Sequence, residues 1–223
     1  MQPHFFPWSG YFNLINKVDY FVFLDDAQFS KQSWQSRNII FINDNKKWIS
    51  IPLENSTISL KINEKKISNK YDWKKKISKT IRQFFLKHEY FNDLEELLIY
   101  FESLDEIYLS DFNIKIINFI LDKMKINTKI FTSSKFNLKL KRTEKIVKIL
   151  EKLKSTDYLA VKGSQQYLVE DKFSELTKIN LSYNDFKCKE YEQYNSKKFI
   201  SNLSIIDVVA NLGWEKTYKY INN

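Results

Sequence analysis

Glycine is scarce in this chain, with only three among 223 residues. Glycine-rich phosphate loops need several glycines at fixed spacing, so the sequence excludes both the GxGxxG dinucleotide loop and the GxxxxGK[ST] P-loop. One glycine and two of the three prolines lie in the opening stretch MQPHFFPWSGYF, among five aromatic residues. Because proline fixes φ and glycine removes a side chain, we expect this stretch to hold a fixed, crowded backbone near something that it binds.

The histidine and cysteine content limits the kinds of site that the chain can build. Cys188 is the single cysteine, which excludes an internal disulfide and fits a reducing compartment. Only two histidines accompany it, so a zinc site of nitrogen and sulfur ligands is not expected. A GxSxG nucleophile motif is also missing. Chemistry would therefore use carboxylates, lysine, arginine, amides or tyrosines, and the sequence leaves the identity of any cofactor unknown.

No segment has the length and polarity of a membrane span, because no apolar run approaches the roughly 18 residues that a bilayer requires. The N-terminus also lacks the pattern of a signal peptide, so we expect a cytoplasmic protein. The net charge of +9 favours anionic partners such as phosphates, nucleotides, RNA or a lipid surface. A general bias toward Lys, Asn and Ile would produce the same charge without a designed patch, and both explanations stay open.

The first half of the chain shows patterns of both strands and helices. The loop FPWSG leads to a helix at 10–18, whose free N–H groups near Gly10 and Tyr11 would favour a phosphate or carboxylate. A strand pattern follows at 20–26, and 38–53 reads as a hairpin with a polar turn. Three helical patterns fill 72–123, and the stripe of the first is Trp73, Ile77, Ile81 and Phe84.

Strands and helices alternate again after residue 126. Strands are expected at 127–134, 157–161 and 179–186, with a helix at 143–153 capped by Thr143 and a final helix at 203–213 closed by Gly213. The whole pattern predicts an α/β fold with a Rossmann-like, mostly parallel sheet, a β-hairpin and a helical insertion at about 70–125. We expect one α/β domain over 1–223.

Three polar groups follow predicted strands. Asp25 and Asp26 end the first strand, Ser133 follows a later one, and 162–164 follow the strand at 157–161. Because ligands bind beyond the carboxyl ends of parallel strands, we expect these groups near the binding site.

The segment from 25 to 38 concentrates residue types that group transfer to a sugar would use: Asp25, Asp26, Gln28, Lys31, Trp34, Arg37 and Asn38. A carboxylate can anchor an ammonium or take a proton, a cation can stabilise an oxyanion or bind phosphate, and an aromatic ring can stack on a sugar. We interpret Asp25 or Asp26 as the base or ammonium anchor. Lys31 and Arg37 would then bind anionic groups, and Trp34 would be the stacking wall.

Each assignment has a structural alternative. Vicinal aspartates at a strand end often start a turn. Lys31 and Arg37 can be solvated surface charges. Trp34 and Trp48 can belong to the core. Asp207, in LSIID, is expected to cap a helix or pair within it rather than to reach a substrate.

The two ends of the chain resemble the WbqC-like family, found in bacterial gene clusters for O-antigen and related polysaccharides. The matching positions at the N-terminal end are Gln2, Pro3, Phe6, Pro7, Gly10, Tyr11, Asp19, Asp25, Asp26, Gln28, Lys31, Trp34, Arg37, Asn38, Trp48 and Pro52. At the C-terminal end they are Gly163, Ser164, Tyr167, Leu168, Tyr191, Gln193, Phe199, Leu203, Ser204, Asp207 and Gly213.

This resemblance implies a transferase of bacterial surface-polysaccharide (O-antigen) biosynthesis that attaches an aminoacyl group such as glycine to an activated amino sugar. The sugar would be nucleotide-linked or lipid-linked, and an aminoacyl-tRNA donor would give the positive charge a purpose. The resemblance also implies an apolar first strand ahead of the Gln-Pro pair, of which Met1 is present here. The substrate-binding set would be Gln2, Pro3, Phe6, Pro7, Gly10, Tyr11, Gln28, Trp34, Asn38, Gly163, Ser164 and Gln193.

Other functions are compared with this one. A non-catalytic module that binds a nucleotide sugar or assists polysaccharide assembly would bind tightly without turnover. A nucleotidyltransferase-like enzyme is suggested because the opening loop resembles FxPxHxGH in spacing, although Trp8 or Ser9 and Tyr11 replace its histidines. A nucleic-acid-binding protein is disfavoured, because the aromatics lie in apolar runs rather than alternating with Lys or Arg on a strand.

Overall fold

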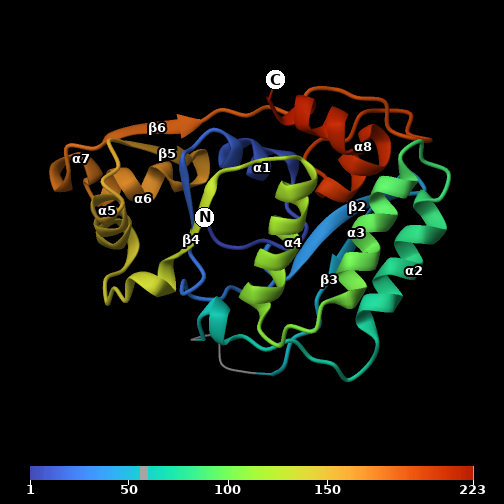
Figure 1. Ribbon diagram of the computed structural model, residues 1–223, viewed down its shortest axis with the longest axis horizontal. Helices are drawn as coiled ribbons and strands as arrows, with labels where there is room; N and C mark the ends of the chain where they lie inside the picture. Colours follow the sequence, from blue (N-terminus) through green and yellow to red (C-terminus); the bar gives the residue numbers. More distant parts are fainter. Residues whose placement is uncertain (56–59, 223) are drawn as a thin grey trace.

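The computed structural model describes residues 1–55 and 60–222 and has a mixed α/β fold (Figure 1). The helices are α1 (Ser9–Asn16), α2 (Trp73–Phe85), α3 (Phe91–Ser103), α4 (Leu109–Lys123), α5 (Arg142–Lys152), α6 (Gln165–Glu170), α7 (Phe173–Leu176) and α8 (Ile205–Asn222). The strands are β1 (Tyr20–Phe23), β2 (Arg37–Ile42), β3 (Asn45–Ser50), β4 (Lys129–Thr132), β5 (Asp157–Val161) and β6 (Asn180–Asn184). Short 3-10 turns are η1 (Ile62–Glu64), η2 (Ser133–Phe136) and η3 (Lys162–Ser164).

The strands form three separate two-stranded pairs among the described residues, so the expected continuous Rossmann-like sheet is not formed there. β1 pairs with β4 and β5 with β6, both in parallel, whereas β2 and β3 are antiparallel. The parallel character of the strands is therefore confirmed, but only pair by pair. In Figure 1, β5 and β6 lie with α5, α6 and α7 at one end, and α2, α3 and α8 lie at the other.

The edge of β1 that faces away from β4 is paired at one position with Met1. The Met1 amino group donates to the Val22 carbonyl at 2.8 Å, and the Leu24 N–H donates to the Met1 carbonyl at 2.7 Å. This pattern, in which one residue bonds to both neighbours of its partner, is a parallel bridge. Met1 therefore lies in register with β1, directly ahead of the Gln-Pro pair.

The hairpin of β2 and β3 has the expected polar turn. Asn43 and Asp44 both have positive φ, 50° and 58°, as the two central residues of a tight hairpin turn require. Alternate residues of β2 point to opposite faces, so Asn38, Ile40 and Ile42 are buried. The other face of the hairpin remains open to solvent in part.

The helices α2, α3 and α4 confirm the three helical patterns at 72–123. In α2 the buried stripe contains Trp73, Ile77 and Ile81, and it continues to Phe85 rather than to the expected Phe84. A step of four residues keeps Phe85 on the same face as Ile81, whereas Phe84 turns partly to solvent. The Asp72 carboxylate caps this helix by accepting from the Lys75 N–H at 3.2 Å.

One predicted helix boundary is wrong and another is confirmed. α5 begins at Arg142, so Thr143 lies inside its first turn, and its hydroxyl donates to Asp171 at 2.7 Å instead of capping the helix. α8 consists of two helices that meet at a kink at Gly213, where φ is 67° and ψ is 177°, so the first helix is closed by Gly213 as predicted. Glycine is needed there because the positive φ coincides with a tight contact with the Tyr90 ring.

The buried apolar residues form two clusters. The larger one joins the opening stretch, β1, β2, the three central helices and α8. The smaller one consists of Ile146, Val147, Leu150, Ala160, Leu168 and Phe173 and lies beneath α5, β5 and α6. The end of the molecule that contains β5 and β6 therefore has its own small hydrophobic core.

Candidate functional site

The opening stretch is held in place by side-chain amides of distant elements. Asn38 of β2 donates to the carbonyls of Phe5 and Phe6, at 3.0 and 2.7 Å. Asn113 of α4 donates to the Pro3 carbonyl at 3.1 Å, and the Ser204 hydroxyl donates to the Phe6 carbonyl at 2.9 Å. Because this irregular backbone is buried, each carbonyl needs such a partner. The fixed shape expected of the stretch is therefore created by interactions within the protein.

Most of the predicted binding residues of this stretch lie in the protein interior. Pro3, Phe6, Pro7 and Tyr11 are buried, and the ring of Trp8 leaves no space for a side chain at Gly10. The first turn of α1 is also buried, and the Ile205 N–H donates to the Pro7 carbonyl at 2.9 Å. The start of α1 therefore contacts the chain ahead of α8 rather than an open anion site.

Two parallel strands bring a group of polar side chains together where they end. Asp25 and Asp26 follow β1, and Ser133 follows β4, as the sequence predicts. The carboxylate of Asp25 accepts from the Ser133 hydroxyl at 3.1 Å and from the Ser134 N–H at 2.9 Å, and only 5% of Asp25 is exposed. Asp25 thus ties the ends of β1 and β4 together, while the Ser133 hydroxyl also reaches Asp26.

Asp26 forms an ion pair with a residue that the sequence did not identify as part of a site. Lys145 of α5 donates to its carboxylate at 2.5 Å, and the two side chains are 12% and 11% exposed. Partial burial opposes ionisation of Asp26, but the hydrogen bonds from Lys145 and Ser133 outweigh it and lower the pKa of the Asp26 carboxyl. Asp26 is therefore ionised at neutral pH.

The order of strands and helices, rather than the local sequence, could have indicated that Lys145 lies near Asp26. A helix that follows a parallel strand starts near the carboxyl end of that strand, so its first turns lie beside residues that end the neighbouring strand. Lys145 lies at the start of α5 and Asp26 after β1, so they meet although 119 positions separate them. The sequence TEKIVKIL offers several lysines and does not show which one is used.

The outer face of the β2–β3 hairpin carries an exposed aromatic and cationic group, which we call the tryptophan face: Trp34, Arg37, Ile39, Phe41, Lys46 and Trp48. Trp34 and Trp48 are each 45% exposed, which corrects the alternative that they belong to the core. Their ring centroids are 5.5 Å apart, and the Arg37 guanidinium lies 4.1 Å from the Trp48 centroid. The guanidinium therefore stacks on an exposed indole.

Arg37 differs from the other two arginines in its partners. Arg82 pairs with Glu95 and Glu102, and Arg142 pairs with Glu170 and Asp171. Arg37 forms no ion pair within residues 1–55 and 60–222, and its Nε atom is buried without a hydrogen-bond partner. The site thus contains one arginine whose charge is not balanced by a carboxylate.

The remaining predicted residues of this segment, Lys31 and Gln28, are both exposed. Lys31 is exposed, and with burial its charge lowers the pKa of Lys65, whose ammonium donates to the Glu54 carbonyl at 2.6 Å. Gln28 is exposed and forms an antiparallel bridge with Lys61. Lys31 therefore adds positive charge near Lys65.

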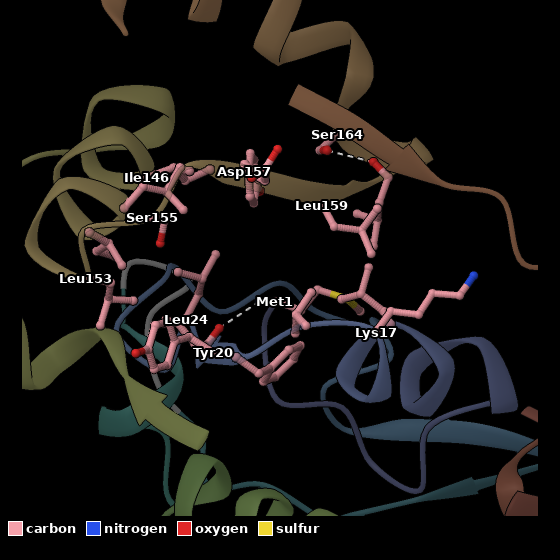
Figure 2. Close-up of a pocket in the computed structure, with 18 of the residues that line it drawn as sticks. Met1, Lys17, Tyr20, Leu24, Ile146, Leu153, Ser155, Asp157, Leu159 and Ser164 are labelled. Carbon is pink, nitrogen blue, oxygen red and sulfur yellow. Dashed lines mark hydrogen bonds between the residues drawn. The ribbon is translucent and has the colours of Figure 1, made fainter. Parts of the chain in front are cut away.

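A cavity of about 780 Å³ lies between β1, α5 and β5 (Figure 2). Gln2, Gly163 and Ser164, all predicted binding residues, contribute to its wall, which is otherwise largely apolar. The Ser164 hydroxyl donates to the Val161 carbonyl at 2.6 Å, and the Gln2 side-chain oxygen accepts from Gln35 at 2.9 Å. The cavity follows the edge of β1 on which Met1 is paired, so it separates the two parallel pairs.

Gln193, the last predicted binding residue, lies apart from the strand ends. Its amide nitrogen donates to Asp207 at 3.1 Å and to the Ile200 carbonyl at 3.0 Å, and its oxygen accepts from the Ile200 N–H at 2.8 Å. Tyr191 also donates to Asp207, at 2.6 Å. Burial raises the pKa of Asp207 to about 6, despite these hydrogen bonds, and raises that of Tyr191 as well. Tyr191 and Gln193 thus connect the segment before α8 to Asp207 in the helix. This agrees with the expectation that Asp207 has a partner within the protein rather than a substrate.

Apart from Gln28, Lys31 and Gln193, the predicted residues therefore divide among four places. The strand ends unite Asp25 and Asp26 with Ser133 and Lys145, and the tryptophan face contains Trp34 and Arg37. Asn38 and most of the opening stretch form a buried support, and Gln2, Gly163 and Ser164 border the cavity.

Comparison with known proteins gives a family match over nearly the whole chain. The sequence model of the WbqC-like protein family matches residues 2–219. A relative from Mycobacterium tuberculosis (strain ATCC 25618 / H37Rv), "Uncharacterized protein Rv1507c", is 29% identical over 219 residues, which cover 96% of this chain and 93% of the relative. No solved structure matches the chain. Among the described residues, no helix has the length and apolar character needed to cross a membrane.

Proposed function

Because the chain belongs to the WbqC-like protein family, we propose that it is a cytoplasmic transferase of bacterial surface-polysaccharide (O-antigen) biosynthesis. It would attach an aminoacyl group such as glycine to the amine of an activated, nucleotide-linked or lipid-linked amino sugar. The observation that carries this proposal is the Asp26–Lys145 ion pair, which lies with Ser133 beyond the carboxyl ends of β1 and β4. Ligands of α/β proteins bind at such strand ends.

The protonation state of Asp26 supports a role in holding the donor. A carboxylate with a lowered pKa is a weak proton acceptor, but it remains charged and binds an ammonium group well. We therefore assign Asp26 to the α-ammonium of the amino acid. Asp25, whose oxygens already accept hydrogen bonds from Ser133 and Ser134, would keep the strand ends in place as a positioning residue.

Lys145 would act on the carbonyl group of the donor. In the transfer, the sugar nitrogen bonds to the carbonyl carbon, the bond from that carbon to the leaving oxygen breaks, and the proton lost by the amine balances the one taken up by the leaving group. Negative charge develops on the carbonyl oxygen in between, and a nearby ammonium stabilises it. Lys31 and Arg37 would bind anionic groups of the substrates, and Trp34 and Trp48 would stack on one of their rings.

The test is a transfer assay with purified protein, an activated glycine donor and a panel of nucleotide amino sugars. Mass spectrometry would detect the glycylated sugar. We expect Asp26→Asn to raise the KM for the donor about tenfold to a hundredfold, the loss of one charged hydrogen bond. Lys145→Met should lower kcat by about a hundredfold or more, because it removes the oxyanion partner.

Controls come from an ion pair of similar chemistry outside the site. Lys219 and Glu215 pair at 2.6 Å on the exposed face of α8, so Glu215→Gln and Lys219→Met should leave turnover unchanged. Circular dichroism would verify that all four variants are folded. Full turnover in both Asp26→Asn and Lys145→Met would contradict the assignment.

A non-catalytic binding module is the second candidate, and the tryptophan face favours it. Stacked rings and an arginine without a carboxylate partner are binding features that require no chemistry at the strand ends. Tight binding of a nucleotide sugar with no turnover under any donor would support this alternative.

A further inference from the structure

The tryptophan face is an exposed surface of alternating aromatic and cationic residues. Arg37, Ile39 and Phe41 alternate with buried residues along β2 and therefore share one side of the hairpin. Ile39 pairs with Trp48 and Phe41 with Lys46, so β3 adds an indole and an ammonium to the same side. The sequence predicts that aromatics lie in apolar runs rather than alternating with Lys or Arg on a strand, but Lys46 and Trp48 share this side of β3.

The charge of this surface is largely unbalanced. Lys46 is exposed and forms no ion pair in the part of the chain that the structure describes, and the same holds for Lys31, three positions before Trp34 in the sequence. Asp44, at the hairpin turn, is the carboxylate on the same hairpin. The stacked Arg37 adds a further cation, and the whole chain has a net charge of +9. A surface of this kind is complementary to a polyanion.

The exposed rings limit which polyanion fits. Trp34 and Trp48 are each 45% exposed, and their ring centroids are 5.5 Å apart, so one chain of bases can contact both indoles. Proteins that bind single-stranded nucleic acids combine such stacking faces with cations that follow the phosphates. A duplex hides its bases inside the stack, so it would not use the indoles.

We propose that the tryptophan face binds a short single-stranded segment of RNA, with bases stacked on Trp34 and Trp48 and phosphates on Arg37 and the neighbouring lysines. This inference rests on the proposed transferase and names the class of its donor: an aminoacyl group carried on the single-stranded end of an RNA. The positive charge of the chain then serves the donor, while the strand ends perform the transfer.

The experiment measures fluorescence anisotropy of a labelled RNA octamer with the full chain. We expect binding that weakens as salt is raised, and the slope of log K against log salt should become shallower by about 0.7 for each phosphate that a variant no longer neutralises. Lys46→Gln should reduce the slope in this way. Trp48→Ala and Trp34→Ala should each weaken binding about tenfold or more, because each removes the stacking face for one base.

The matched control is a similar aromatic and lysine pair elsewhere on the surface. Tyr71 is 53% exposed, and the Lys76 ammonium lies 5.9 Å from its ring centroid, but both are remote from the hairpin in sequence and belong to the start of α2. Tyr71→Ala should leave RNA affinity unchanged. Asp26→Asn should also retain RNA binding, so failure of the transfer chemistry would not be confused with failure of this proposal.

Three results would overturn the inference. The first is no binding of the octamer at low salt. The second is binding that Trp48→Ala and Trp34→Ala leave intact, or that Tyr71→Ala weakens equally. The third is equal affinity for double-stranded RNA, or binding of a nucleotide sugar in place of the octamer. Salt-dependent binding of the single strand that requires both tryptophans would support it.

Discussion

The opening stretch and the tryptophan face are both rich in aromatic residues, but they differ completely in exposure. Phe5, Phe6 and Tyr11 have no exposed surface, whereas Trp34 and Trp48 are nearly half exposed. The stretch that is more conspicuous in the sequence thus places these rings in the protein interior. A high density of aromatic residues does not distinguish a buried support from a binding surface. The hydrogen-bond and ion-pair partners of the neighbouring polar groups do.

Those partners differ in the same way. The carbonyls of the opening stretch accept hydrogen bonds from Asn38, Asn113 and Ser204, so donors within the protein pair these backbone groups. On the tryptophan face, Arg37 has an indole beneath it and no carboxylate partner within the described ranges. A region whose buried polar groups all have hydrogen-bond partners within the protein supports the fold. A guanidinium without a carboxylate partner is available to bind an anionic ligand.

The largest effect that separates the two regions should come from Phe6→Ala. The Phe6 ring packs 4.6 Å from the ring of Phe5 and 5.3 Å from that of Phe101, measured between centroids, and is fully buried. Truncating a buried phenylalanine typically costs about 3–5 kcal/mol, because apolar burial decreases and a cavity is left behind. Chemical denaturation would measure the free energy of unfolding. A decrease below about 1 kcal/mol would show that the stretch is not the support inferred here.

A second prediction compares carboxylates instead of rings. Asp207 is buried with a pKa of about 6 in the folded chain, against an ordinary value of 3.8, so the folded state holds its proton to higher pH than the unfolded state does. Stability from this group is present below about pH 4 and is lost as pH rises through about 6, up to about 3 kcal/mol. Asp207→Asn should therefore gain stability over the native chain between pH 4.5 and 7.

The measurement is the difference in unfolding free energy between Asp207→Asn and the native chain at each pH, which cancels the other carboxylates. Asp26→Asn is the matched comparison. The pKa of Asp26 is lowered, so its contribution is present at neutral pH and decreases as pH falls toward the acid range. The two variants should thus show opposite pH dependence, and the same sign in both would refute the contrast.

The secondary structure was largely predictable from the sequence, because its signals are local. The strand at 157–161, the hairpin and the three helices of 72–123 follow from alternation, a polar turn and helical spacing. The assembly of strands was not predictable, because a parallel pair depends on residues far apart, and the alternation of β5 and β6 does not show which edge they would meet. The structure leaves a cavity where a continuous sheet was expected.

The candidate site was predictable only in part, for a related reason. Asp25, Asp26 and Ser133 could be placed together, since each follows a strand that carries its own signal. Lys145 and the exposure of Trp48 could not, because a lysine on a helix and a tryptophan on a strand have the same sequence pattern whether they face a site, the solvent or the core. Burial decides between these roles, and it is a property of the whole fold.

A third and smaller effect should come from Asn38→Ala. The Asn38 amide donates to two carbonyls of the opening stretch, and its oxygen accepts from the Ile39 N–H at 2.7 Å. Removing it leaves buried carbonyls without a donor, which costs about 1–3 kcal/mol. Thermal unfolding would detect this destabilisation, and RNA affinity should change little. A strong decrease in affinity with an unchanged melting temperature would instead assign Asn38 to the binding surface.

The smallest effect on stability should come from Trp48→Ala. A small effect would show that the tryptophan face contributes less to the stability of the fold than the opening stretch does. The indole of Trp48 is 45% exposed and contacts Trp34 and Arg37, so the variant gives up a cation–π interaction of about 0.5–1 kcal/mol and less buried area than an interior ring would. Chemical denaturation should therefore give a change of about 1–2 kcal/mol, smaller than for Phe6→Ala. A surface residue that costs little to remove is retained for what it binds outside the protein. A destabilisation of about 3 kcal/mol or more in Trp48→Ala would make the tryptophan face a structural feature like the opening stretch, and the contrast between the two regions would fail.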